Sequence, residues 1–246
     1  MLFELALLNF ALPAALSHLV VMKAPWFSIN ATKQLPALGL NSELEEDADS
    51  VPHLWIFGYG SLMWNPGFEF SESRKGSLFG YSRRFWQGNT NFRGDEKLPG
   101  RVVTLIECGS TKPTAATHGL LFKVTGADAI LQALTHLQWR EIDSGYEFRR
   151  VNVTTTVTTD QSSSSVLIDA VTCVATDANR YYLGPSPSVQ EMAKQIARAK
   201  GKAGPNSEYL LKLADYMRTM FPGVRDKHLF SLEQLVLRHL TLPDAA

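Results

Sequence analysis

Two stretches in the middle of the chain constrain its fold most strongly, because both are dense in β-branched residues. They read YEFRRVNVTTTVTT (146–159) and VLIDAVTCVAT (166–176), and the polar run DQSSSS (160–165) separates them. Val, Ile and Thr favour strands because their branched side chains pack well on a pleated surface. We therefore expect a long pair of adjacent strands joined by the polar loop.

Four more stretches have the composition of strands, and all of them precede this pair. They read HLWIFG (53–58), KGSLFGYSRRFWQG (75–88), RVVTLIE (101–107) and THGLLFKV (117–124). The chain from residue 51 onward is thus expected to contain about six strands.

Helical patterns lie between the strands and after them. Residues 127–138 place their leucines and isoleucine on one face of a helix. In the last third, Ser188 and Glu191 form a capping box for a helix that Gly201 is expected to end. Asn206 is expected to cap a second helix, and a third carries apolar residues between 229 and 240. Strands first and helices last predict an α+β fold, with a mainly antiparallel sheet or small barrel and helices around it.

The charge balance and the cysteine and histidine content exclude several classes of protein. The chain has 24 Lys and Arg and 24 Asp and Glu, so it lacks the basic field of a nucleic-acid-binding protein. Its two cysteines, Cys108 and Cys173, are expected to be reduced thiols rather than a disulfide scaffold. The six histidines never occur in the spacing of a zinc site, and no phosphate loop or dinucleotide fingerprint is present. We expect no metal and no organic cofactor.

The first fifty residues differ in character from the rest. Residues 5–21 are almost all apolar, but no Lys or Arg precedes them. A secretory signal would require positive charge at that place, and a mitochondrial signal would require arginines. Membrane contact or targeting through residues 1–23 is one interpretation, and a helical extension or an over-extended start is preferred to it. The acidic stretch NSELEEDADS (41–50) is typical of a solvated linker. We expect an extension over 1–50 and a folded domain over 51–246.

A glycine-containing loop, FGYGSLMW (57–64), follows the first expected strand. Gly58 and Gly60 would let a ligand approach the main chain, and successive N–H groups would hold a carboxylate or a polarised carbonyl oxygen. The alternative is a tight turn that the neighbouring aromatic residues bury.

Two other stretches contain candidate functional side chains. In LQWREIDSGYEF (137–148), Glu141 lies where the middle helix ends, and burial beside Trp139 and Tyr146 would raise its pKa and make it a usable general base. The alternative is a surface ion pair with Arg140 or Arg149.

The second stretch is YSRRFWQGNTNFRG (81–94), which holds three arginines among aromatic residues. Arg83, Arg84 and Arg93 could bind a substrate carboxylate. Equally, they could brace a long loop.

Several separated motifs together resemble the ChaC-like family of glutathione-specific γ-glutamylcyclotransferases. They are WIFGYGSLMWNPGF, YSRRFWQGNTNFRG with PGRVVTL, WREIDSGY, YYLGPSP and NSEYLLKLA, which together extend over most of the chain from about Trp55 to Leu240. The resemblance implies a small β-barrel flanked by helices. Residues 1–50 match nothing in the family.

The resemblance also implies the site residues and the reaction. The floor of the pocket for the γ-glutamyl group would be made by Ile56, Phe57, Gly58, Tyr59, Gly60 and Ser61. The catalytic carboxylate would be Glu141. Gln132 stands where some relatives have an acidic residue, which puts a second carboxylate in doubt.

The implied enzyme is a carbon–nitrogen lyase of the cytoplasm that cleaves glutathione into 5-oxoproline and Cys-Gly. The α-amine of the glutamyl group would attack its own γ-carbonyl, with Glu141 transferring the proton. Two alternatives remain open: a cyclotransferase for other γ-glutamyl amines or amino acids, and a non-catalytic protein that uses the same fold to bind a partner.

Overall fold

The computed structural model describes residues 51–108, 115–158 and 162–241. The expected extension over 1–50, with its apolar segment and its acidic linker, therefore lies outside the described residues. The strands are β1 (His53–Gly58), β2 (Glu72–Phe79), β3 (Tyr81–Asn89), β4 (Gly100–Glu107), β5 (Ala116–Thr125), β6 (Glu147–Thr158), β7 (Ser163–Val174), β8 (Lys200–Gly201) and β9 (Gly204–Pro205). The helices are α3 (Ala127–Arg140), α4 (Val189–Arg198), α5 (Asn206–Met220) and α6 (Lys227–Thr241), with 3-10 turns η2 (Ser61–Met63) and η4 (Ile142–Ser144).

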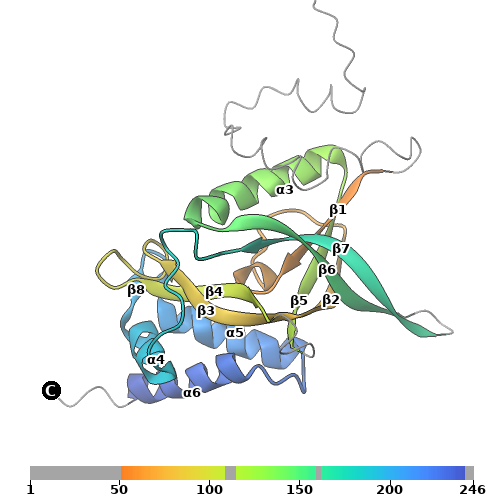
Figure 1. Ribbon diagram of the computed structural model, residues 1–246. Coiled ribbons are helices and arrows are strands. Elements are labelled where there is room, and N and C mark those ends of the chain that lie inside the picture. Colours follow the sequence, from red (N-terminus) through yellow and green to blue (C-terminus); the bar gives the residue numbers. More distant parts are fainter. Residues whose placement is uncertain (1–50, 109–114, 159–161, 242–246) are drawn as a thin grey trace, which may run out of the picture.

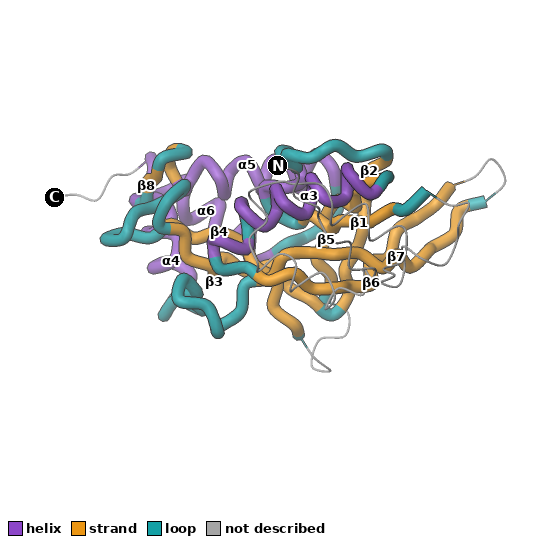
Figure 2. The backbone as a smooth tube through the Cα atoms, turned by 90° about the horizontal axis from the view of Figure 1, so that it is seen from above, coloured by secondary structure: helices purple, strands orange, loops and turns teal. Residues whose placement is uncertain are grey.

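The main sheet is a closed barrel with the strand order β1-β5-β2-β6-β7. Its neighbours are antiparallel except where β7 and β1 close the barrel in parallel, through the pair Ile56 and Val171. The expected long pair is β6 and β7, which stay in register from Glu147↔Val174 to Thr158↔Ser163. This pair extends beyond the rest of the barrel (Figure 2). The α+β barrel fold predicted from the sequence is confirmed.

Two expected boundaries on the strands were wrong. The stretch 75–88 is not one strand: Gly80, with φ of +80°, separates β2 from β3. Because the chain turns there, β2 stays in the barrel and β3 pairs with β4 in a second, two-stranded sheet. Ser163 to Ser165 belong to β7 rather than to the loop, since pairing with β6 continues past the apolar residues.

Helix α3 covers one side of the barrel, and the helices α4, α5 and α6 pack together beneath β3 and β4 (Figure 1). Four α3 residues form a small core with β1, β5 and β7: Ile130, Ala133, Leu134 and Leu137. A larger core joins the barrel interior to the C-terminal helices. Burial of these apolar faces is the main driving force for docking the helices on the strands.

One helix cap was predicted correctly and one was not. The Ser188 side chain accepts a hydrogen bond from the Glu191 N–H at 3.1 Å, as the capping box predicts. Asn206, however, is the first residue of α5 and does not cap it: its side chain is fully buried and bonds to the Arg101 N–H and C=O. The helix α4 ends before Gly201, which lies in β8.

None of the helices among the described residues is both long and apolar enough to cross a lipid bilayer.

Candidate active site

A cavity of about 340 Å³ lies where the barrel, β4, the end of α3 and the start of α5 meet. We call it the glycine-loop cavity, after the loop Tyr59–Leu62 that forms part of its wall. Its volume falls within the range of about 300–1,000 Å³ that is usual for small-molecule sites. Its walls combine polar side chains with the rings of Tyr59, Tyr146 and Tyr209.

Three of the six loop residues predicted from the sequence line this cavity. Tyr59, Gly60 and Ser61 lie on its wall. Ile56 and Phe57 are fully buried in the two cores and hold β1 in place behind the loop. The loop then enters the turn η2, whose first N–H groups have no partner within the turn.

The glycines of this loop serve close packing rather than an unusual φ. Neither Gly58 nor Gly60 has a positive φ. A Cβ atom on Gly60 would lie 2.8 Å from Val103 Cγ2 and 3.0 Å from the Tyr209 hydroxyl oxygen. The lack of a side chain is therefore what this site requires of Gly60.

Glu141 lies at the junction between α3 and η4. Its N–H donates to the Leu137 carbonyl, and its own carbonyl accepts from Ser144 and Tyr146, so the backbone on both sides fixes its position. The side chain is 16% exposed and lines the cavity. Burial raises the pKa of the Glu141 carboxyl above its usual value, and the neighbouring Arg140 partly offsets this effect.

Arg140 connects the carboxylate to the glycine loop, a role that was not predicted. Its Nε lies 2.9 Å from Glu141 Oε1, Nη2 donates to Ser61 Oγ at 2.8 Å, and Nη1 donates to the Asn65 carbonyl at 2.6 Å. The sequence motif offered Arg140 only as an ion-pair partner of Glu141. The ion pair between Arg140 and Glu141 does form, but both residues line the cavity instead of lying on the outer surface. Glu141 is therefore both a candidate general base and one member of an ion pair.

Three tyrosines line the same cavity as the carboxylate: Tyr59 and Tyr209 are buried, and Tyr146 is half-buried. The Tyr59 hydroxyl donates to the Cys173 carbonyl at 2.6 Å, and the Tyr146 hydroxyl donates to the Val103 carbonyl at 2.7 Å. Burial, above all, raises the pKa of Tyr59, Tyr146 and Tyr209, and the nearby Glu141 charge adds to the effect. These phenols therefore stay protonated and act as hydrogen-bond donors.

The three arginines of the 81–94 stretch separate into two groups. Arg93 lines the glycine-loop cavity and pairs with Glu208 at 3.4 Å. Arg83 and Arg84 line a different cavity. The alternative in which all three bind one carboxylate does not fit this arrangement, because Arg83 and Arg84 lie on β3 whereas Arg93 lies in the loop that follows it. Trp139, expected in the wall beside Glu141, lines the cavity but is 65% exposed.

No group of three or more His, Cys, Asp or Glu side chains within the described ranges is placed to hold a metal ion.

Comparison with known proteins assigns this closed barrel, with its carboxylate beside a glycine loop, to one protein family. A profile of the ChaC-like protein family matches residues 54–239. Among curated proteins, the chain is 45% identical over 185 residues to glutathione-specific gamma-glutamylcyclotransferase 1 of Danio rerio, covering 75% of this chain and 89% of that one. It is 44% identical over 184 residues to the Homo sapiens protein of the same name, covering 74% and 78%.

The fold comparison agrees. The crystal structure of a yeast gamma-glutamyl cyclotransferase specific to glutathione matches with a TM-score of 0.67 at 25% identity, covering 76% of this chain and 96% of that one. The chain belongs to the ChaC-like family.

Proposed function

We propose that the protein is a glutathione-specific γ-glutamylcyclotransferase that converts glutathione into 5-oxoproline and Cys-Gly. The observation that carries the proposal is the Glu141 carboxylate, largely buried and held by Arg140 against the glycine loop in the glycine-loop cavity. The relatives at 44–45% identity carry this activity in their names and support the choice of substrate.

The reaction needs little beyond the correct substrate conformation. The α-amine of a γ-glutamyl group reaches its own γ-carbonyl by forming a five-membered ring. Attack forms the ring C–N bond, and collapse of the tetrahedral intermediate breaks the amide bond to cysteine. Well-oriented intramolecular attack can lower the barrier by roughly 7–11 kcal/mol, so a cavity that imposes the curled conformer accounts for much of the catalysis.

Glu141 transfers the proton. Its carboxylate accepts a proton from the α-ammonium, and the resulting acid returns it to the departing cysteine nitrogen. Burial brings the pKa of the carboxyl nearer to neutrality, which suits a group that must first accept and then donate. Arg140 keeps the carboxylate ionised before the substrate amine is deprotonated.

Hydrogen-bond donors around the γ-carbonyl stabilise the oxyanion of the intermediate. The N–H groups of Gly60 and Ser61 at the start of η2 are proposed for this role, as part of the predicted set Ile56 to Ser61. Ile56, Phe57 and Gly58 support the loop from behind. At the other side of the cavity, the Arg93 guanidinium is placed to bind a carboxylate of the substrate.

The proposal is tested by Glu141→Gln, an isosteric change that removes the proton acceptor. We expect the rate of Cys-Gly release to fall by at least about 10³-fold, while glutathione binding, measured by calorimetry, changes little. The matched control is Glu147→Gln, which removes an exposed carboxylate from an ion pair with Arg149. Activity of Glu141→Gln within tenfold of wild type would overturn the assignment of the base.

We further propose that residues 51–246 form the folded enzyme domain and that residues 1–50 are an extension. The proposed reaction requires no metal and no organic cofactor. We propose a cytoplasmic location, which the lack of a disulfide between Cys108 and Cys173 supports because a reducing compartment keeps cysteines in the thiol form. A rival cyclotransferase acting on other γ-glutamyl amines would use the same ring closure, and assays of γ-glutamyl-alanine beside glutathione distinguish it.

A further inference from the structure

A second cavity, of about 440 Å³, lies between β3, the start of β5 and the loop before α6. We call it the basic cavity because Arg83, Arg84, Arg225 and Lys227 line it. Within the described ranges it shares no lining residue with the glycine-loop cavity. The proposed reaction assigns it no role.

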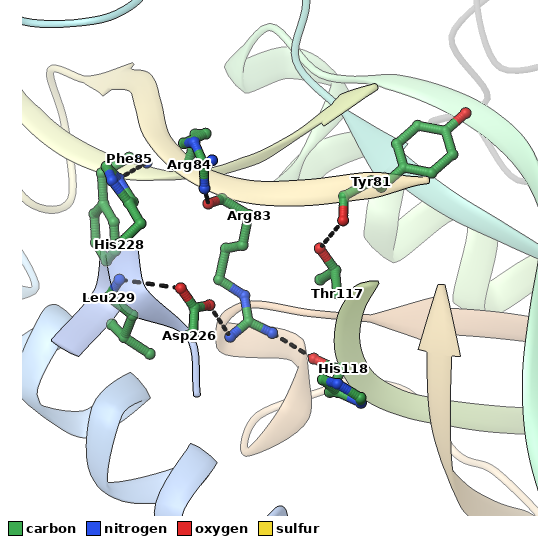
Figure 3. A network of polar contacts seen from close by, with 9 residues as sticks. All are labelled: Tyr81, Arg83, Arg84, Phe85, Thr117, His118, Asp226, His228 and Leu229. Atoms are coloured by element: carbon green, nitrogen blue, oxygen red, sulfur yellow. Dashed lines mark hydrogen bonds and ion pairs between the residues drawn. The ribbon is translucent and has the colours of Figure 1, made fainter. Parts of the chain in front are cut away.

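The one carboxylate among the described residues that line it is already neutralised. Asp226 Oδ2 lies 3.3 Å from Arg83 Nη1, and its Oδ1 accepts from the Leu229 N–H at 3.1 Å (Figure 3). The Arg83 guanidinium also donates to the His118 carbonyl. Arg84, Arg225 and Lys227 therefore give the cavity an uncompensated positive charge.

One N–H donor of the Arg83 guanidinium has no hydrogen-bond acceptor among the described residues. The Arg83 side chain is 1% exposed and lines the cavity, and the donor concerned is its Nε. A buried guanidinium N–H without an acceptor costs free energy unless a ligand or water supplies one. Arg83 thus brings an unsatisfied buried donor to the wall of this cavity.

The first turn of α6 adds further donors. α6 begins at Lys227, and the side chain and carbonyl of Asp226 engage the N–H groups of Leu229 and Phe230. The N–H groups of Lys227 and His228 precede these and have no intrahelical acceptor. The positive end of the helix dipole therefore lies at the same cavity as the three uncompensated cations.

His228 is fixed in one tautomer at this cavity. Its Nε2 accepts from the Phe85 N–H at 3.2 Å, so the ring proton is on Nδ1. Burial and the charge of Arg84 lower the pKa of His228 to about 4, which makes the ring neutral at physiological pH. His228 therefore contributes a neutral N–H donor and adds no charge.

We propose that the basic cavity binds the phosphate group of a small phosphorylated compound. Guanidinium groups, an ammonium group and helix N–H groups together match the several acceptor oxygens and the double charge of a phosphate monoester. The volume exceeds what inorganic phosphate alone would fill, so the rest of the compound occupies the cavity too. The site is independent of the proposed function, since no step of the glutathione reaction uses it.

The test measures binding to the full chain without glutathione, so its failure leaves the proposed activity untouched. The probes are inorganic phosphate and pyrophosphate, titrated by calorimetry, with acetate at matched ionic strength as the comparison. We expect saturable binding of pyrophosphate, weaker binding of phosphate and none of acetate. Absence of saturable binding of both phosphate probes would overturn the proposal.

Single substitutions locate the site. Lys227→Gln and Arg225→Gln change exposed residues and should each weaken pyrophosphate binding by about tenfold. The matched control is Arg238→Gln, an exposed base in the last turn of the same helix, which should change binding by less than about twofold. Equal effects of all three would indicate diffuse charge attraction and contradict a defined site.

A lipid headgroup carries the same chemistry and is tested separately. Vesicles of phosphatidylcholine with and without phosphatidic acid are sedimented with the full chain. We expect no co-sedimentation that depends on Lys227. Co-sedimentation with phosphatidic acid vesicles that Lys227→Gln abolishes would overturn the assignment to a small compound.

Discussion

Glu141 and Arg140 are adjacent in the chain, and they exert opposite effects on one titration. Burial raises the pKa of the Glu141 carboxyl, and the Arg140 guanidinium lowers it, with burial dominating. The folded protein therefore holds the proton on Glu141 more tightly than an unfolded chain would. As pH rises above the usual Glu value of 4.5, ionising this buried group costs stability, and the ion pair limits that cost.

The same balance predicts the acid limb of the pH–rate profile. We expect kcat/KM to fall with decreasing pH through a pKa above 4.5, because the protonated carboxyl cannot accept the amine proton. Arg140→Gln removes the group that lowers this pKa and should move the limb upward by about one pH unit. Arg149→Gln, at an exposed ion pair, is the control. A limb that stays in place or moves to lower pH in Arg140→Gln would contradict the role of Arg140.

Gly60 offers a second test at the residue scale. Gly60→Ala places a Cβ 2.8 Å from Val103 Cγ2, so the loop or β4 must shift, at an expected cost of about 1–3 kcal/mol in the free energy of unfolding. Turnover should fall as well, since the loop N–H groups move. Denaturant unfolding and the glutathione assay measure both.

The double variant Gly60→Ala/Val103→Ala supplies the control, because it removes the methyl group that clashes. We expect it to be less destabilised than the sum of the two single variants. Strict additivity would show that the Val103 contact is not the reason for a glycine at position 60.

At the scale of elements, Asn206 ties α5 to β4. Its fully buried amide accepts from the Arg101 N–H at 2.7 Å and donates to the Arg101 C=O at 2.8 Å. Asn206→Ala leaves both backbone groups buried without partners and should lower the free energy of unfolding by about 2–4 kcal/mol. Thr219→Ala, at an exposed position of the same helix, should change it by less than about 0.5 kcal/mol. A small effect of Asn206→Ala would mean that water replaces the amide.

The elements that local patterns determine were predictable from the sequence. β6 and β7 follow from their β-branched residues, α3 from its apolar face, and the start of α4 from the Ser188 capping box. The junction that holds Glu141 was predictable for the same reason, since a helix end beside the Ser144–Gly145 turn is a local signal.

The remaining features depend on contacts between residues far apart in the chain. Alternating apolar residues do not show that a strand leaves one sheet for another at Gly80. Asn206 is a residue type that often caps helices, but its hydrogen bond with Arg101, 105 residues away, determines its role. The link from Arg140 to Ser61, 79 residues apart, likewise arises only from the fold. The division of Arg83 and Arg93 between two cavities has the same origin.

At the scale of the whole molecule, the family match spans residues 54–239 and leaves the first fifty residues outside it. A chain starting at Val51 should therefore fold and keep its turnover within about twofold of the full chain. Circular dichroism and the glutathione assay compare the two chains at equal concentration. Aggregation or loss of turnover in the shorter chain would show that residues 1–50 are needed by the domain.

The reaction also predicts which relatives of glutathione the whole enzyme accepts. α-Linked Glu-Cys-Gly places its scissile carbonyl next to the amine, where attack would require a three-membered ring. N-acetyl-glutathione has its amine lone pair delocalised into an amide. Neither compound can close the five-membered ring, although both keep a peptide bond to cysteine that ordinary hydrolysis would cleave.

The most direct measurement compares glutathione with these two compounds on one enzyme preparation, following 5-oxoproline and Cys-Gly together by mass spectrometry. Intramolecular cyclisation predicts equal amounts of both products from glutathione and neither product from the two analogues. Release of Cys-Gly from either analogue at a rate comparable to that from glutathione would show hydrolysis by water and contradict the cyclotransferase mechanism.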